Sequence, residues 1–112
     1  MNIDLKIKPL SVNEAWQGKR FKTAKYKKFE SDMLMLLPKF KGEIPEMIRI
    51  ELFFGFSNSL SDLDNPVKLV IDCLQKKYGF NDKSIFEMNL RKCIVKKGNE
   101  FISIGIYSLT PF

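Results

Sequence analysis

Two aspartates one residue apart stand in the most polar segment of the chain. Asp62 and Asp64 lie within the run Ser61-Asp62-Leu63-Asp64-Asn65-Pro66-Val67-Lys68. In an extended segment, side chains two residues apart project to the same side, so both carboxylates are expected to point at one place while Leu63 faces the core. Two such carboxylates repel each other unless a proton or a cation lies between them. A hard divalent cation is the usual solution in nuclease and phosphotransfer sites.

Lys68 falls in the first turn of the helix predicted after Pro66, where its ammonium group would meet a phosphate or a leaving oxygen. A structural interpretation stands beside this one. Asp and Asn before a helix that starts with Pro are common turn and capping residues, and a lysine four residues before Asp72 commonly forms a surface ion pair. On these residues alone, the capping interpretation is favoured. Asn65 and Asp72 are secondary candidates for the site.

The chain contains no histidine and only two cysteines, Cys73 and Cys93. This composition excludes His-based triads, imidazole general bases, His-ligated zinc and a four-Cys zinc site within one chain. Carboxylate, lysine or hydroxyl chemistry remains, with or without a cation that prefers oxygen ligands, such as Mg²⁺. The two cysteines do not indicate a secreted disulfide framework, and the longest apolar run, Met33 to Leu37, is far shorter than the roughly 20 residues of a membrane span. We therefore expect a soluble cytoplasmic protein with no membrane partner.

The chain carries 19 Lys and Arg against 13 Asp and Glu, a net charge of +6. This balance suits nucleic acid, an anionic membrane surface or no particular partner, and charge alone does not decide among them. The densest basic segment forms a candidate phosphate-binding surface, whose alternative is an ordinary solvated face. The candidate DNA-binding residues are Asn13, Lys19, Arg20, Lys22, Lys25, Lys27, Lys28 and Lys92. Trp16 either stacks on DNA or packs within the protein.

Hydropathy patterns predict six elements in the order β-α-β-α-β-β. Thr23 is the expected N-cap of the first helix, and an irregularity is expected near Arg91 to Cys93, where the apolar face switches. At 112 residues, the pattern predicts a single α+β domain over 1–112, with two helices packed on a small mixed sheet. The expected strands and helices span residues 2–8, 23–37, 47–56, 66–78, 85–97 and 101–109.

A longer pattern extends the acidic segment in both directions. It comprises Pro9-Leu10-Ser11-Val12-Asn13, the run from Asp62 to Lys68, Asp72-Cys73-Leu74 and Gly79-Phe80-Asn81-Asp82. This pattern resembles the signature of the RusA-type Holliday junction resolvases, and the resemblance runs from Pro9 to about Lys92. It implies that Asp62, Asp64, Asp82 and Lys68 form the catalytic set, with the three aspartates as metal ligands. The family loop often carries two consecutive acids, whereas here Asn81 precedes Asp82.

The resemblance also implies a homodimer that depends on Mg²⁺, with Mn²⁺ as a substitute, and that nicks four-way DNA junctions symmetrically. The predicted second helix spans roughly 20 Å, and the residues from Gly79 to Asp82 reach roughly 10 Å at most. These lengths predict that Asp82 lies too far from Asp64 of its own chain and completes the site of the other subunit.

The function expected from the sequence is a metal-dependent endonuclease that resolves Holliday junctions in DNA recombination and repair. The bound Mg²⁺ would activate water and stabilise charge on the scissile phosphate, and Lys68 would assist at the phosphate. The alternative is a non-catalytic basic DNA- or RNA-binding module in which Asp62, Asp64 and Asn65 only form a helix cap.

Overall fold

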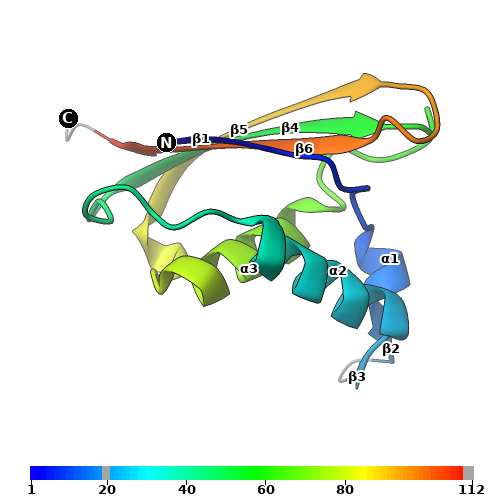
Figure 1. Ribbon diagram of the computed structural model, residues 1–112, viewed down its shortest axis with the longest axis horizontal. Coiled ribbons are helices and arrows are strands. Elements are labelled where there is room, and N and C mark those ends of the chain that lie inside the picture. The colour runs from blue at the N-terminus through cyan, green and yellow to red at the C-terminus, as the bar shows by residue number, and fades with distance from the viewer. Residues whose placement is uncertain (19–20, 110–112) are drawn as a thin grey trace.

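The protein folds into two layers, a four-stranded sheet and a layer of helices on one face of it (Figure 1). The computed structural model describes residues 1–18 and 21–109. The elements that match the predicted order are β1 (Asn2–Leu5), α2 (Ala24–Leu36), β4 (Ile48–Phe56), α3 (Val67–Tyr78), β5 (Ile85–Ile94) and β6 (Phe101–Ser108). The predicted mixed α+β class is confirmed.

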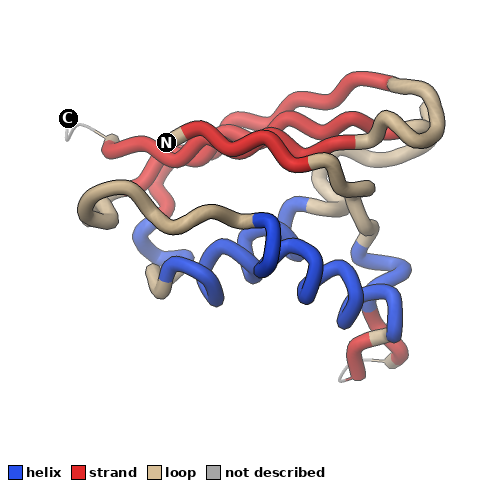
Figure 2. Tube along the Cα trace, in the orientation of Figure 1, coloured by secondary structure: helices blue, strands red, loops and turns tan. Residues whose placement is uncertain are grey.

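Four short elements lengthen the predicted order. Between β1 and α2 the chain forms α1 (Val12–Ala15) and a small hairpin of β2 (Trp16–Gln17) and β3 (Phe21–Lys22). A single 3₁₀ turn, η1 (Asp82–Ser84), precedes β5. Figure 2 shows the strands of the main sheet on one side and the long helices on the other, with loops joining the two layers at both ends. None of the described helices has the length and apolarity needed to cross a membrane.

The sheet has the strand order β1-β6-β4-β5. β4 pairs antiparallel with β6 and parallel with β5, and β1 pairs antiparallel with β6. A parallel pair needs a crossover connection, and α3 is that connection between β4 and β5. As a result, α3 packs beside an edge strand, and the residues that enter and leave α3 lie next to β5.

The core lies between the sheet and the helices because the inward positions of the strands are apolar. On β4 the alternating residues from Ile48 to Phe56 are buried, as the period-2 pattern predicts. The inward side chains of α2 include Tyr26, Phe29 and Met33. At the end of α2, Leu36 is 47% exposed, whereas its neighbour Leu37 is buried. The other buried residues of this core on β6 and α3 are Ile102, Ile104, Ile106, Leu69, Val70, Ile71, Cys73, Leu74 and Tyr78.

The helix boundaries agree closely with the sequence patterns, except at the start of α3. Thr23 caps α2, since its hydroxyl oxygen accepts the backbone N–H of Tyr26 at 3.2 Å. At α3, however, Pro66 occupies the N-cap position and no side chain caps the helix. The prediction that Asn65 provides this cap is therefore wrong. A turn, in which the Asp62 carbonyl accepts the N–H of Asn65, takes the place of a side-chain cap.

β5 begins with a one-residue irregularity that the sequence did not predict. Ile85 pairs with Ile48 and Glu87 with Arg49, so Phe86 is an extra residue opposite β4. From Glu87 to Ile94 the register is regular, and the expected irregularity near Arg91 to Cys93 does not occur. β5 also ends at Ile94, three residues before the predicted end. A one-residue bulge reverses the alternation of faces, so Met88 and Leu90 turn towards the helices.

Candidate functional site

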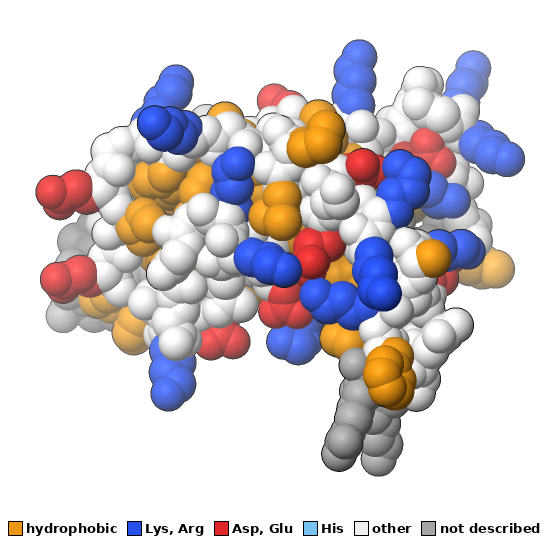
Figure 3. Space-filling model, turned by 60° about the horizontal axis from the view of Figure 1, so that its bottom comes forward, with side chains coloured by type: hydrophobic (Ala, Val, Ile, Leu, Met, Phe, Trp, Pro, Cys, Tyr) orange, Lys and Arg blue, Asp and Glu red, His pale blue; other side chains and the backbone are white. Residues whose placement is uncertain are grey.

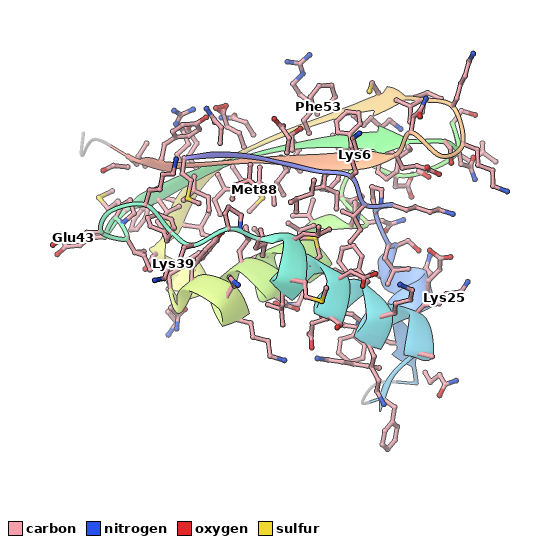
Figure 4. The ribbon with its side chains drawn as sticks, viewed as in Figure 1. Lys6, Lys25, Lys39, Glu43, Phe53 and Met88 are labelled. Atoms are coloured by element: carbon pink, nitrogen blue, oxygen red, sulfur yellow. The ribbon has the colours of Figure 1, made fainter. Side chains whose placement is uncertain are left out.

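An open groove of about 420 Å³ lies between α3 and the edge strand β5. Figure 4 shows Met88 on the helix side of the sheet and Phe53 on the opposite, helix-free face. The groove floor is apolar, and three polar side chains stand along it. The lining residues are Val67, Ile71, Ile85, Met88 and Leu90, with the polar Asp64, Lys68 and Asp82. Three of the four residues predicted to be catalytic therefore line a single groove of one chain.

Asp64 and Lys68 are placed by the turn into α3 and by its first helical turn. The backbone carbonyl of Asp64 accepts the N–H of Val67 at 3.2 Å. The Asp64 carboxylate therefore takes no part in the hydrogen bond of this turn. Lys68 follows in the first turn of α3 and lines the same groove. Its Nζ atom lies 3.5 Å from Asp72 Oδ1, and 72% of the lysine side chain is exposed. The ion pair predicted as an alternative is thus present, but it is long and solvated.

Asp82 reaches the groove because the chain reverses after α3. Gly79 ends the helix in the left-handed conformation, with φ of +78°, and its N–H donates to the Gln75 carbonyl at 2.8 Å. The next three residues run back beside the helix, where the backbone N–H of Asp82 donates to Gln75 Oε1 at 2.7 Å. Asn81 starts η1 by accepting the N–H of Lys83 at 2.9 Å.

Asp82 and Asp64 line the same groove, although they flank opposite ends of α3. The length comparison took the loop at its full reach and placed Asp82 too far from Asp64 of the same chain. Asp82 lies beside Gln75, which belongs to the last turn of α3, and it lines the same groove as Asp64. A second subunit is therefore not needed to bring these two carboxylates to one groove.

Asp62 lies apart from the groove, and the predicted extended conformation around it is wrong. Residues 63–66 form turns, with the N–H of Asn65 bonded to the Asp62 carbonyl and that of Val67 to the Asp64 carbonyl. Turns break the alternation that would align the two carboxylates. Asp62 and Asn65 line a separate pocket of about 310 Å³, which the loop from Lys8 to Ser11 and the end of β4 also border.

The carboxylate oxygens that line the groove are of the type that hard cations such as Mg²⁺ prefer. Among residues 1–18 and 21–109, no three Asp, Glu or Cys side chains come together as a group that holds a metal. Mg²⁺ is commonly bound by only one or two carboxylates, with water and substrate phosphate oxygens filling the other positions. Asp64 and Asp82 are the two carboxylates that line this groove, and Lys68 is its basic residue.

The predicted basic surface carries less unpaired charge than the sequence indicates. Although residues 15–29 contain no acid, three acids from outside this run contact its lysines. Glu30 lies 2.9 Å from Lys22, Glu14 lies 3.5 Å from Lys25, and Asp32 lies 2.9 Å from Lys28. Figure 3 shows acidic side chains flanked by basic ones on the helical face.

The other DNA-binding candidates differ in their surroundings. Asn13 on α1 and Lys27 on α2 are exposed, and Lys27 has no ion pair within the described part of the chain. Lys92 donates to the backbone carbonyl of Ser61 at 2.7 Å, so it ties β5 to the segment that carries Asp62. Lys19 and Arg20 lie outside the described residues. Trp16 packs edge-to-face on Tyr26, with ring centroids 5.3 Å apart, as the packing alternative predicts.

Glu30 joins α2 to α3, since its second oxygen lies 2.9 Å from Lys76 Nζ. Burial acts to raise the pKa of Glu30, but the hydrogen bonds and positive charges of Lys22 and Lys76 outweigh it and hold the pKa below the ordinary value of 4.5. The folded state therefore favours the ionised carboxylate. Its stabilising contribution is complete above the ordinary pKa and is lost as the pH falls through the lower folded-state value.

Glu30→Gln is accordingly expected to lower the free energy of unfolding at pH 7 by about 1–2 kcal/mol, since it removes two charge-assisted hydrogen bonds. The difference from the unsubstituted protein should disappear at a pH below the folded-state pKa. Urea unfolding at a series of pH values measures it. Asp32→Asn removes an exposed i,i+4 pair and serves as the control, with a loss of about 0.5 kcal/mol or less. A difference that is constant with pH would contradict the assignment.

Comparisons with known proteins add no family assignment. No protein-family model matches the chain, and no curated protein matches it.

Proposed function

We propose that the protein is a Mg²⁺-dependent, structure-specific endodeoxyribonuclease that resolves Holliday junctions by paired symmetric nicking. One observation supports the proposal most. Asp64, Lys68 and Asp82, which the resemblance to the RusA-type resolvases singles out, line one groove although the two acids are 18 positions apart in sequence. A helix cap gives no reason for the third acid to turn back towards the first.

Each polar residue of the groove has a role in this proposal. The carboxylates of Asp64 and Asp82 hold the cation, and Mg²⁺, when bound, supplies water activation and stabilises charge on the scissile phosphate. Lys68 has a mostly exposed ammonium group and only a long contact to Asp72, so it is free to pair with a phosphate oxygen. Asp62 contributes only if the turns at residues 63–66 rearrange on binding.

The proposed partner is branched DNA bound mainly through its backbone. Lys27 and Asn13 are exposed near α1 and α2, where phosphates have access to them, and such contacts position a protein without reading sequence. A homodimer suits the substrate because a four-way junction offers two equivalent strands to cut, and a two-fold axis relates two equivalent sites.

The test uses a synthetic four-way junction, a linear duplex of the same sequence as the matched control, and buffers with Mg²⁺ or with a chelator. Paired nicks at symmetric positions in the junction, with Mg²⁺ only, are the expected result. The duplex should remain uncut. A junction that is retarded on a native gel and never nicked, with either Mg²⁺ or Mn²⁺, would refute the nuclease.

The rival function is a basic nucleic-acid-binding module without catalysis. The observation that favours it is the separation of Asp62 from Asp64, which line different pockets on the two sides of one turn. In this alternative, the acids serve only the entry into α3. Retardation without nicking in the experiment above is the result that this function predicts.

A further inference from the structure

Gln75 lies on α3, seven residues beyond Lys68, and its side-chain amide has a partner on each side. Its Oε1 atom accepts the backbone N–H of Asp82 at 2.7 Å. Its Nε2 atom lies 3.5 Å from Asp72 Oδ1, the atom that also lies 3.5 Å from Lys68 Nζ. A continuous series of contacts therefore joins the two groove residues Lys68 and Asp82 through Asp72 and Gln75.

The η1 turn lies between two residues that pack in or against the core, Phe80 and Ile85. None of the three residues of η1 is itself buried, so apolar packing holds the flanks of the turn and not Asp82 directly. The hydrogen bonds from Ser84 to Asn81 and from Lys83 to Asn81 are internal to the turn. Within the described part of the chain, the bond from Asp82 to Gln75 is the hydrogen bond that connects η1 to α3.

The chemistry of glutamine fits this place. An amide provides one acceptor, which takes the Asp82 N–H, and a donor, which faces the Asp72 carboxylate. Glutamate keeps the acceptor but cannot donate to Asp72 when ionised. Methionine has a similar length and offers neither group. These differences separate the contact to Asp82 from the contact to Asp72.

We propose that Gln75 is a positioning residue, which holds the carboxylate of Asp82 on the groove and links it to Lys68 through Asp72. The structural part of this inference concerns the folded chain alone. The part that concerns nicking rests on the proposed function.

Amide hydrogen exchange of the full chain, without DNA, tests the structural part. Gln75→Met and Gln75→Ala are expected to speed exchange at the Asp82 amide by about tenfold, as the loss of one hydrogen bond implies. Gln75→Glu should leave it close to the unsubstituted rate because the acceptor remains. Gln17→Ala changes the other glutamine of the chain, which is exposed on β2, and is the control. An Asp82 amide that exchanges at an unchanged rate in Gln75→Ala would overturn the inference.

A Mg²⁺ titration of junction nicking tests the functional part. Gln75→Met is expected to raise the Mg²⁺ concentration for half-maximal nicking by about 10-fold, the effect of losing a residue that orients a ligand. Gln75→Glu should need no more Mg²⁺ than the unsubstituted protein. A merely structural role would lower the nicking rate equally at every Mg²⁺ concentration, without a shift of the half-maximal value.

The two proposals fail in different ways. If the unsubstituted protein does not nick junctions, the proposed function fails. The exchange rates then still decide whether Gln75 holds Asp82. If the unsubstituted protein nicks and Gln75→Met shows faster exchange with an unchanged Mg²⁺ dependence, the link between Gln75 and the site is wrong.

Discussion

Asp64→Asn is expected to reduce Mg²⁺-dependent nicking of a four-way junction by more than about a hundredfold, since even the partners behind a metal ligand are worth about 10- to 100-fold. The substitution removes a ligand charge from the groove and keeps the size of the side chain. Binding of the junction should persist or tighten, because one negative charge near the phosphates is lost. Nicking assays and gel retardation on the same samples measure both effects.

Folding separates this prediction from the capping alternative. The backbone carbonyl of Asp64, not its carboxylate, accepts the N–H of Val67, so Asp64→Asn should leave the thermal unfolding midpoint nearly unchanged. Asp4→Asn on β1, a strand at the other edge of the sheet, is a control that should nick normally. If Asp64→Asn unfolds the protein, the carboxylate serves the helix and the nuclease site is misassigned.

A mixture of Asp64→Asn and Asp82→Asn chains is expected to show no recovery of nicking. Both carboxylates line one groove of one chain, so each centre in a mixed dimer lacks one of them. The reciprocal mixture joins an unsubstituted chain to a chain that carries both substitutions. It should retain one complete centre and nick one of the two strands. Differently tagged chains allow the mixed dimers to be isolated before the assay.

These two mixtures give opposite results for a site shared between subunits. A shared site would leave one complete centre in the first mixture and none in the second. Recovery in the first mixture would therefore show that Asp82 acts on the partner chain, as the length argument from the sequence predicted. The geometry of the groove favours the reverse outcome.

The regular elements could be predicted from sequence because their signals are local. The alternation on β4 and the Thr23 cap of α2 depend on neighbouring residues, and both are confirmed. The bulge at Phe86 was missed because a one-residue insertion is defined by the register against β4, which is a long-range pairing. The short α1 and the hairpin of β2 and β3 have too few residues to produce a periodic pattern.

The candidate site was predicted in composition but not in arrangement. The residue types pointed to Asp64 and Lys68, the resemblance to the RusA-type resolvases added Asp82, and all three line the groove. The extended conformation around Asp62 was wrong because turn hydrogen bonds around Asn65 and Pro66 replace it. Helix and loop lengths set how far Asp82 can extend, but they do not show that the chain reverses after Gly79.

Contacts between distant segments explain the remaining differences. Lys76 meets Glu30 across 46 residues of sequence, and the acids around the basic run approach it from outside that run. The role of Gln75 also escapes a sequence pattern, because its partner is a backbone N–H, which every residue except proline offers. Only its spacing from Asp72, at i,i+3, indicates that the two side chains share a helix face.

The 12 residues of α3 act as a spacer of fixed length and phase between the two acids that flank it. Each helical residue advances the chain by about 1.5 Å and turns it by about 100°. Inserting or deleting one residue within α3 would swing Asp82 around the helix axis relative to Asp64, even if every other contact were kept. The connection from Leu37 to Met47 lies outside the stretch of chain that joins the two acids, and it contacts the end of α3 where the Tyr78 hydroxyl donates to the Pro38 carbonyl at 2.7 Å.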